Sequence, residues 1–572
     1  MQVLAVIVVV LILLIGLFVY EGVRARNDLE AARHDAHTLQ HQLTDADFDA
    51  ATKTTTTLRD HTAHARSNTS GWLWSAATHL PLIGDDIDAV RTIAASLDTV
   101  AQQALPTVID LSHRVEDGAL QPRGGRLPLD AIGDLAPSVQ RAADVVDGPA
   151  DHVAALHPGH LFGSLSSAVR QAQDQISETR STLDTLARTF KALPAAAGQD
   201  GPRDYLLLFQ NNAEVRASGG IAGAWAVMHA AHGRLSISRQ GTGAALDADP
   251  PRTPPLRITK AERLLYGSEY GTELRDANFT PDFPRYAQLA DALVSRVTGV
   301  DFDGVFSVDP VALSYLLRGT GPVQVGPTTL TAANATRLLL NQVYFDYTPA
   351  GQDRFFARAA QAIFTAVAAG QGKPVTVIKA LAQGVAERRI LAWSDEPALD
   401  AAIGHTAIAG LLTAPSGPPQ VGIFVDDATA TKLEYYLDMS TTLARATCDG
   451  DDETVVVTTR LHSRVPKSAH LPASVTGPAK FAPEGTMVLN ARIFSPAGGA
   501  VSKLSLDGEK ETVAGGAWGA RQAVILPVQI APGQTRRLTT TLTLRKAGSG
   551  AIRLTTTPGM HSGDNPVTVG SC

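Results

Sequence analysis

The chain has 572 residues, which is too long for one hydrophobic core and predicts two to four domains of roughly 100 to 200 residues each. Hydrophobic residues make up 44% of the chain, charged residues 18%, and the net charge is only -7. This composition is that of a globular protein, and it argues against wholesale disorder and against a nucleic-acid coat protein. No basic tract of the kind that binds DNA or RNA occurs in the sequence.

Residues 3–20 (VLAVIVVVLILLIGLFVY) form an uncharged apolar run about as long as a helix needs to cross a bilayer. The run predicts a transmembrane anchor over residues 1–21. A cleaved signal peptide is the alternative, but the run is longer than the apolar part of such a peptide, and Glu21, Arg24 and Arg26 follow it in place of small residues. The two arginines disfavour an outward orientation, although long domains cross membranes largely regardless of charge. We therefore expect a single-pass protein of the cell membrane, with the bulk of the chain outside the cytoplasm.

Apolar residues recur at spacings of three and four behind this run, and again from Leu165 to Leu193. The first set is Ala25, Leu29, Ala32, Ala36, Leu39, Leu43, Ala46 and Ala50. This heptad pattern predicts long helices that pack on one another. The β-branched stretch Thr54–Thr57 weakens the prediction locally. We expect residues 22–198 to form a helical bundle or coiled stalk. Such a stalk could also associate with a second copy to form a homo-oligomer.

The pattern changes at Gly201-Pro202, after which short apolar runs alternate with helical segments. Residues 204–209 (DYLLLF) have the continuous hydrophobicity of a strand buried on both faces. Further strands are predicted at residues 224–229, 234–239 and 304–309. Thr331 is placed to cap a helix that runs through Leu340. Interleaved strands and helices predict an α/β core domain, a mixed sheet with helices, over residues 199–415.

Residues 416–572 contain strand-like stretches separated by Gly- and Pro-rich turns, which predicts an all-β, sandwich-like domain. The many threonines on these strands need no functional explanation, because Thr favours half-exposed strands. Cys448 and Cys572 are the two cysteines of the chain. Their even number is compatible with one disulfide in an oxidising compartment, and two unrelated thiols are the alternative.

Polar residues gather where the strand at 204–209 ends. Residues 209–220 (FQNNAEVRASGG) supply Asn211, Asn212, Glu214, Arg216, Gly219 and Gly220. Such groups at the end of a buried strand line a crevice in many α/β proteins. Arg216 would bind a phosphate or carboxylate with two hydrogen bonds, and the two glycines would let the backbone approach a ligand. The alternative is a capped strand end with an internal Glu214-Arg216 pair.

A second polar cluster lies at residues 274–284 (LRDANFTPDFP), with Arg275, Asp276, Asn278 and Asp282. Two carboxylates and an arginine in one loop suit a hydrated metal, a diphosphate or a general base, but they equally suit a solvated loop. The sequence has no P-loop, HExxH, CxxC or G-x-S-x-G motif. Nucleotide hydrolysis, zinc proteolysis and serine hydrolysis therefore lack support.

These clusters occur in order with residues 300–325 (VDFDGVFSVDPVALSYLLRGTGPVQV) and residues 330–344 (LTAANATRLLLNQVY). With them, the chain resembles the membrane-anchored family catalogued as domain of unknown function 4012, strongly from about residue 203 to residue 345. The resemblance implies an extracytoplasmic α/β domain behind one transmembrane helix. It implies no particular activity.

The order of LSISR (residues 235–239), the RDAN loop and residues 299–309 (GVDFDGVFSVD) is more distantly similar to the LytR-CpsA-Psr family. Members of that family transfer lipid-diphosphate-linked glycopolymers onto peptidoglycan, with arginines and aspartates around the pyrophosphate and a divalent metal. The resemblance implies that Arg239 matches an arginine of that site. Ser238 and Gln240 replace the proline and the acid that flank it in the family.

Two functions follow as expectations. The first is a non-catalytic cell-envelope protein, without a cofactor, that binds an anionic glycan or lipid-linked glycopolymer in envelope assembly. The second is a LytR-CpsA-Psr-like phosphotransferase or pyrophosphatase that uses Mg²⁺. In that case Arg216 and Arg275 would hold the diphosphate, and Asp276 or Asp282 would bind the metal or act as a base. The expected partners are the lipid bilayer and a cell-wall glycopolymer, and no nucleic acid.

Overall fold

The computed structural model of the protein describes residues 2–412, 419–449, 452–466, 471–477, 482–545, 552–560 and 568–569. Side chains are described for these residues except 2–15, 445–446, 448–449, 545 and 568–569. The chain forms two units. One comprises Met1–Gln121 and Pro128–Pro194, and the other comprises Pro122–Leu127 and Ala195–Cys572.

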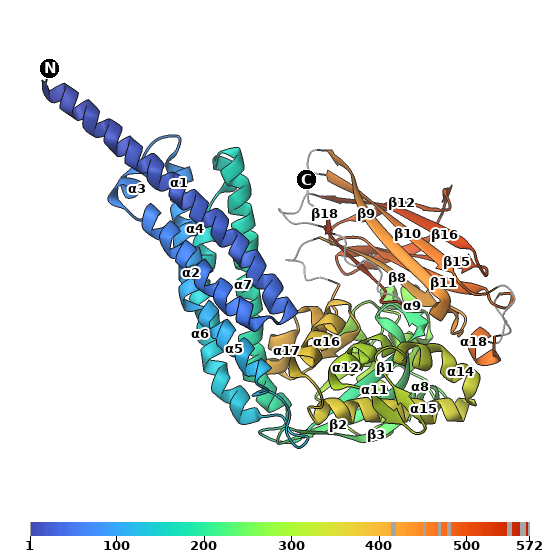
Figure 1. Ribbon diagram of the computed structural model, residues 1–572. Helices are drawn as coiled ribbons and strands as arrows, with labels where there is room; N and C mark the ends of the chain where they lie inside the picture. Colours follow the sequence, from blue (N-terminus) through green and yellow to red (C-terminus); the bar gives the residue numbers. More distant parts are fainter. Residues whose placement is uncertain are drawn as a thin grey trace. The chain divides into compact units, whose positions relative to one another are not determined.

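The first unit is helical (Figure 1). Its elements are α1 (Gln2–Asp45), α2 (Phe48–Thr69), α3 (Trp72–Ala77), α4 (Gly84–Gln103), α5 (Leu105–Glu116), α6 (Leu129–Ala154), η1 (Pro158–His160) and α7 (Gly163–Ala196). Heptad residues face inward, because Ala32 and Leu39 of α1 pack with Leu58 of α2 in one buried cluster. The Thr-rich stretch does not interrupt α2, and Thr55 is buried inside it. The expectation that these threonines weaken the helix is wrong, because packing against neighbouring helices outweighs the small helix-propensity penalty of Thr.

The prediction of a transmembrane helix at residues 3–20 is corrected by the structure. Among the residues that the structure describes, none of the helices is both long enough and apolar enough to cross a membrane. The side chains of residues 1–15 lie outside the description, and the described part of α1 carries Glu21, Arg24 and Arg26 within about two turns. Polar residues continue along α1 to Asp45. The small and apolar residues between them pack against the rest of the bundle.

The second unit begins with a five-stranded mixed sheet in the order β3-β2-β1-β4-β7. Strands β1 (Arg203–Arg216), β2 (Gly219–Ala231) and β3 (Arg234–Thr242) are antiparallel neighbours. Strand β4 (Gly304–Val308) runs parallel to β1, and β7 (Ile390–Trp393) runs antiparallel to β4. The four predicted strands are confirmed, and Leu206 and Leu208 of β1 are fully buried as their continuous hydrophobicity requires.

Helices and short strands connect these strands. They are α8 (Gly243–Leu246), α9 (Lys260–Tyr266), η2 (Glu269–Gly271), α10 (Leu274–Ala277), α11 (Phe283–Thr298), α12 (Pro310–Thr320), β5 (Val323–Val325), β6 (Thr328–Leu330), α13 (Ala335–Arg337), η3 (Leu338–Gln342), α14 (Val343–Asp346), α15 (Pro349–Ala368), α16 (Pro374–Ala386), α17 (Pro397–Ile403) and η4 (Ala407–Ala409). The Thr331 hydroxyl accepts a hydrogen bond from Asn334 N at 3.2 Å just before α13. The helix then continues through the π-helical turn η3 to Asp346, beyond the predicted end at Leu340.

Two sheets face each other in the β-rich part of this unit (Figure 1). The first has the order β13-β12-β16-β10-β9 and the second has the order β14-β15-β11-β8-β17-β18. The elements are β8 (Gln420–Asp427), η5 (Leu433–Tyr436), β9 (Leu437–Asp449), β10 (Asp452–Ser463), α18 (Ala473–Thr476), β11 (Met487–Phe494), β12 (Ala500–Leu506), β13 (Glu509–Lys510), β14 (Ala514–Trp518), β15 (Arg521–Ile530), β16 (Thr535–Arg545), β17 (Ile552–Thr556) and β18 (Thr568–Val569). Leu461, Leu489 and Leu542 are fully buried in the core that these strands form. The predicted Cys448-Cys572 disulfide lies outside the residues whose side chains are described.

Strands β1 and β2 extend beyond the sheet as a two-stranded projection, residues 210–222, which we call the hairpin arm. β1 pairs with β4 only as far as Phe209, whereas its pairing with β2 continues to Arg216 and Gly219. Asn211 pairs with Ile221 and Val215 pairs with Gly220, so residues 212–214 bulge out of the ladder. The bulge directs side chains of β1 toward other parts of the unit.

Close backbone packing at this bulge requires a glycine at position 220. A Cβ there would lie 2.2 Å from the carbonyl carbon of Asn211, whereas none of the described atoms lies within 4 Å of a Cβ at Gly223. We expect Gly220→Ala to lower the free energy of unfolding by about 2–3 kcal/mol, because the backbone must move. The matched control Gly223→Ala should change it by less than about 1 kcal/mol. Urea denaturation measures both, and equal effects of the two substitutions would contradict the bulge geometry.

Candidate functional site

The hairpin arm lies against strand β8 and helix η5 of the β-rich part, so the polar stretch at its centre is buried. Asn212 and Ser218 are fully buried, and Glu214 and Arg216 almost so. At the tip of the arm, Ala217 N donates to Asp426 Oδ1 at 2.8 Å. The residues that the sequence assigned to a crevice therefore contact protein on both sides.

Glu214 lies between two cations. Its Oε1 accepts from Arg216 Nη2 at 3.0 Å, and its Oε2 pairs with the ammonium group of Lys432. Burial raises the pKa of Glu214, but Lys432 and Arg216 together outweigh burial and hold this pKa below its usual value. Glu214 is therefore a carboxylate, and the internal Glu214-Arg216 pair that the sequence allowed as an alternative is present.

The guanidinium of Arg216 makes four hydrogen bonds inside the protein. Besides Glu214, it donates from Nε to Arg275 O at 3.1 Å and from Nη1 to Val215 O at 2.9 Å and Asp427 O at 3.3 Å. One face of it lies 4.9 Å from the ring centroid of Phe279. These contacts engage both edges of the side chain that was expected to bind an anionic ligand.

A second buried pair joins Arg492 of β11 to Asp426 of β8. Arg492 also donates from Nε to Leu265 O at 3.1 Å, and its guanidinium lies 4.9 Å from the Phe279 ring. Phe279 is thus in cation-π contact with both Arg216 and Arg492. The loop after α10 is therefore in contact with the hairpin arm through Arg216 and with the β-rich part through Arg492.

A third group of charges lies where β1 leaves the mixed sheet. Asp309 Oδ2 accepts from Asn212 Nδ2 at 2.9 Å and from Arg389 Nη1 at 2.8 Å. Asp309 Oδ1 caps α12 by accepting from Ala312 N at 2.7 Å. Arg389 reaches Glu387 at 2.6 Å through Nε and Gly559 O at 2.9 Å through Nη2. Both carboxylate oxygens of Asp309 are therefore hydrogen-bonded.

The RDAN loop packs on the tip of the arm through its asparagine, because Asn278 Nδ2 donates to Gly220 O at 2.5 Å. Arg275 is exposed and pairs with Glu273. Burial raises the pKa of Asp276 to about 6, although Arg216 and Arg275 act in the opposite direction. The charge of Asp276 therefore changes near pH 6.

Of the other predicted residues, Asn211 and Gly219 belong to the hairpin arm, whereas Asp282 and Arg239 lie apart from it. Burial raises the pKa of Asp282, which stands at the N-terminus of α11 near Arg388. Arg239 is exposed on β3, opposite Val227, and donates to Thr298 O at 2.7 Å. Asn211 donates to the Tyr344 hydroxyl. Gly219 has a φ of +142° and lies under the Gln210 side chain. The structure thus gathers Asn211, Asn212, Glu214, Arg216, Gly219, Gly220, Arg275, Asp276 and Asn278 in or around the arm, while Arg239 and Asp282 lie outside it.

Several charged residues of this network were not predicted from the sequence, among them Asp309, Arg389, Asp426, Lys432 and Arg492. Two local signals were present in the sequence. Asp426 and Asp427 end an apolar run, and Arg388 and Arg389 precede another, much as Asn212 and Glu214 come after the apolar run at residues 204–209. Within the described residues there is no group of three or more His, Cys, Asp or Glu side chains arranged to hold a metal ion. Asp276 and Asp282 therefore belong to no such group.

Glu434 of η5 is a buried carboxyl group without a charged partner. It lines a small cavity of about 20 Å³ with Val215, Met439 and Thr557, which is room for about one water molecule. Neither of its carboxyl oxygens has a hydrogen-bond partner in another described residue. Burial, and then Asp427 and Glu214, raise the pKa of Glu434 well above its usual value, which favours the protonated form of this side chain.

The second unit thus contains a mixed sheet with helices and a β-rich part with two sheets. Buried charged residues from both parts pair with one another. Residues 200–344 match the model of the family described as "Protein of unknown function (DUF4012)", which confirms that resemblance. None of the curated proteins or solved structures gives a match. The more distant similarity to the LytR-CpsA-Psr family stays a prediction.

The Asp309-Arg389 pair provides a test of the buried network. Arg389→Met would leave Asp309 and Glu387 without their shared cation, and we expect a loss of about 3–5 kcal/mol in the free energy of unfolding. Arg263→Met, at an exposed position of α9, is the matched control and should change stability by no more than about 0.5 kcal/mol. Urea denaturation at low and high salt measures both. A loss below about 1 kcal/mol at Arg389 would contradict a network that depends on this pair.

Glu434 predicts a pH dependence. Its raised pKa means that the folded protein keeps a proton that the unfolded chain loses above about pH 4.3. Stability contributed by this group therefore falls as pH rises from there toward the folded-state pKa. Glu434→Gln keeps the size and removes the titration, so we expect its stability relative to the original protein to improve by at least about 1 kcal/mol between pH 5 and pH 8. A difference that does not vary with pH would show that Glu434 is ionised or solvated.

Proposed function

We propose that the protein is a non-catalytic binding protein, and that it binds an anionic glycan on the outer face of the sheet β13-β12-β16-β10-β9. The observation that carries the proposal is a pair of arginines. Arg460 of β10 is directly opposite Arg537 of β16, and both side chains are exposed. Like charges directly opposite each other destabilise a sheet, and a bound anion would relieve this repulsion.

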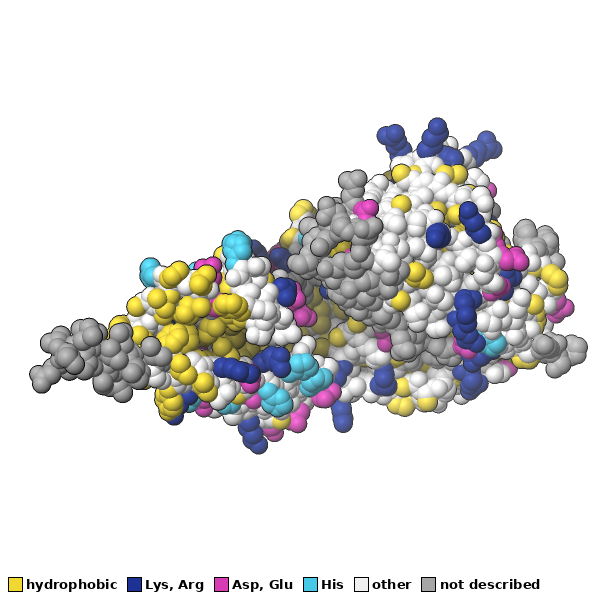
Figure 2. Space-filling view, turned by 90° about the horizontal axis from the view of Figure 1, so that it is seen from above, with side chains coloured by type: hydrophobic (Ala, Val, Ile, Leu, Met, Phe, Trp, Pro, Cys, Tyr) yellow, Lys and Arg dark blue, Asp and Glu magenta, His cyan; other side chains and the backbone are white. Residues whose placement is uncertain are grey.

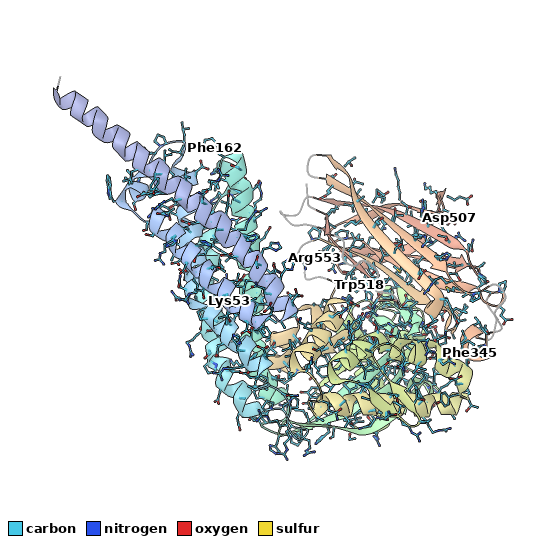
Figure 3. All side chains as sticks on the ribbon, in the orientation of Figure 1. Lys53, Phe162, Phe345, Asp507, Trp518 and Arg553 are labelled. Carbon is cyan, nitrogen blue, oxygen red and sulfur yellow. The ribbon has the colours of Figure 1, made fainter. Side chains whose placement is uncertain are left out.

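Two acidic residues in this region of the chain are paired with other arginines. Asp507 pairs with Arg536 at 2.6 Å, and Asp438 pairs with Arg464 at 3.0 Å. Asp507 lies at the edge of the β-rich part, where Figure 3 labels it. Seen from above, this part presents a largely uncharged surface from which Lys and Arg side chains project (Figure 2). The electrostatic character of this face therefore favours an anion.

Hydroxyl groups adjoin the arginines in a regular array. The strand register places Thr442, Thr458, Thr539 and Ser505 in one row across four strands. Neighbouring members of such a row are about 4.8 Å apart. Threonines alone would be ordinary for an exposed sheet. Next to an arginine pair, they offer donors and acceptors for sugar hydroxyls while the guanidinium groups bind phosphate or carboxylate.

The transferase alternative has less support from the geometry. Arg216, which would hold the diphosphate, has its hydrogen bonds within the protein. Of the residues assigned to that chemistry, Arg275 is exposed, and it pairs with Glu273. The proposal assumes a location where anionic glycopolymers occur, which is the cell envelope that the sequence predicts.

The test compares two double variants with the same change in charge. Arg460→Gln/Arg537→Gln removes the pair, and Arg263→Gln/Arg553→Gln removes two exposed arginines elsewhere in the unit. Calorimetry with polygalacturonate as the anionic glycan and dextran as the neutral one measures the dissociation constant. We expect the first variant to bind polygalacturonate at least about tenfold more weakly, because each charged hydrogen bond contributes about 1.5–3 kcal/mol. The control should bind normally, and dextran should bind to neither.

Two results would overturn the proposal. Equal weakening in both double variants would indicate attraction by net charge alone. Normal binding by the first variant, with loss of binding in Arg275→Ala, would move the site to the RDAN loop.

A further inference from the structure

Large apolar side chains are exposed together at one end of the helical unit. Leu82 is 92% exposed, Trp72 69% and Phe162 63%, and Leu80 and Ile83 are also exposed. We call these five residues the apolar tip. Figure 2 shows hydrophobic side chains gathered over this unit, and Figure 3 labels Phe162 at the end of the bundle.

The apolar tip is built from three segments of the helical unit. Trp72 begins α3, Leu80–Ile83 connect α3 to α4, and Phe162 precedes α7. Phe162 N donates to Asp86 Oδ1 at 3.1 Å, which fixes the third segment beside the start of α4. Single exposed apolar residues are common on protein surfaces. A group of them from distant parts of the sequence indicates an interaction surface.

Helix α1 continues this surface. The Trp74 indole donates to Glu21 Oε2 at 3.0 Å, and its ring centroid lies 4.7 Å from that of Phe18. Beside Phe18, the side chains of Leu17, Val19 and Tyr20 are exposed. The apolar tip is therefore at the level where the described side chains of α1 are most apolar.

The connection between α3 and α4 holds Leu82 outward in an unfavourable conformation. Its φ is +75°, in the left-handed region that leucine avoids. The backbone packs closely two residues later, because a Cβ at Gly84 would lie 2.3 Å from Thr78 O. Strain that holds an apolar side chain in water rather than in the core is typical of a binding surface.

We propose that the apolar tip docks on the surface of a lipid bilayer, with Trp72, Leu82 and Phe162 entering the boundary between headgroups and acyl chains. Trp is enriched at that boundary, and apolar side chains on projecting loops can enter it without a groove in the partner. None of the five residues is basic, and Asp85 and Asp88 beside them are exposed acids. The contact is therefore hydrophobic, and it favours neutral lipid over anionic lipid. It requires no helix that crosses the membrane.

The experiment uses the full chain and vesicles of phosphatidylcholine, with brominated acyl chains as the quencher of tryptophan fluorescence. We expect quenching in the original protein and loss of the quenched component in Trp72→Phe. In flotation with unbrominated vesicles, Leu82→Ser/Phe162→Ser should bind about 10- to 100-fold more weakly, since two apolar side chains leave the bilayer. Leu264→Ser/Phe345→Ser, which changes exposed apolar residues of the other unit, is the matched control. Both variants retain the sequence of residues 3–20, so their difference reports on the tip.

Circular dichroism confirms that the variants keep their helices. Binding that resists 0.5 M NaCl supports the hydrophobic contact. Three results would overturn the proposal: no quenching of Trp72 by brominated lipid, equal flotation of the two double variants, or loss of a dimer in sedimentation by the Leu82→Ser/Phe162→Ser variant with unchanged vesicle binding. The last result would make the tip an interface between copies of the chain.

Discussion

Glu214 of the hairpin arm lies between Arg216 of its own strand and Lys432 of the β-rich part, and all three are removed from most of the solvent. Burying one of these charges alone would cost several kcal/mol, so the arm can occupy this position only when its partners are in place. The bulge at residues 212–214 makes the pairing geometrically feasible, because it frees β1 from the ladder where the charged side chain must turn toward Lys432.

The same requirement explains why the mixed sheet and the β-rich part behave as one unit. Asn212 donates to Pro558 O, Ala217 N to Asp426 and Arg389 to Gly559 O, so each connection joins the mixed-sheet part to a segment 170 to 346 residues later. A buried ion pair adds little to stability relative to an apolar pair of the same shape, but it tolerates few alternative arrangements. We therefore infer that the buried charges fix the position of the mixed sheet relative to the β-rich part. Ligand contacts are expected on the exposed faces instead.

Strong local patterns allowed much of the fold to be predicted. Leu206 and Leu208 belong to a continuous apolar run, which predicts a strand buried on both faces. The role of residues 209–220 could not be predicted, since polar groups after a strand have the same pattern whether they line a crevice or meet charges from elsewhere in the chain. Lys432 is 218 residues away from Glu214, and only the tertiary fold brings them together. At residues 3–20, the apolar run was interpreted by itself, whereas α1 continues to Asp45 as a helix that packs in the bundle.

Hydrogen exchange of the full chain tests most directly whether the hairpin arm is an internal element. If its charges hold the arm against the β-rich part, the hydrogen-bonded amides of Ala213 and Ala217 should be protected as strongly as those of Leu206 and Leu208 in the middle of β1. Addition of an anionic glycan should leave that protection unchanged. Exchange of the arm within seconds, or protection that appears only with the glycan, would show that residues 210–222 form an open ligand site and would contradict this account.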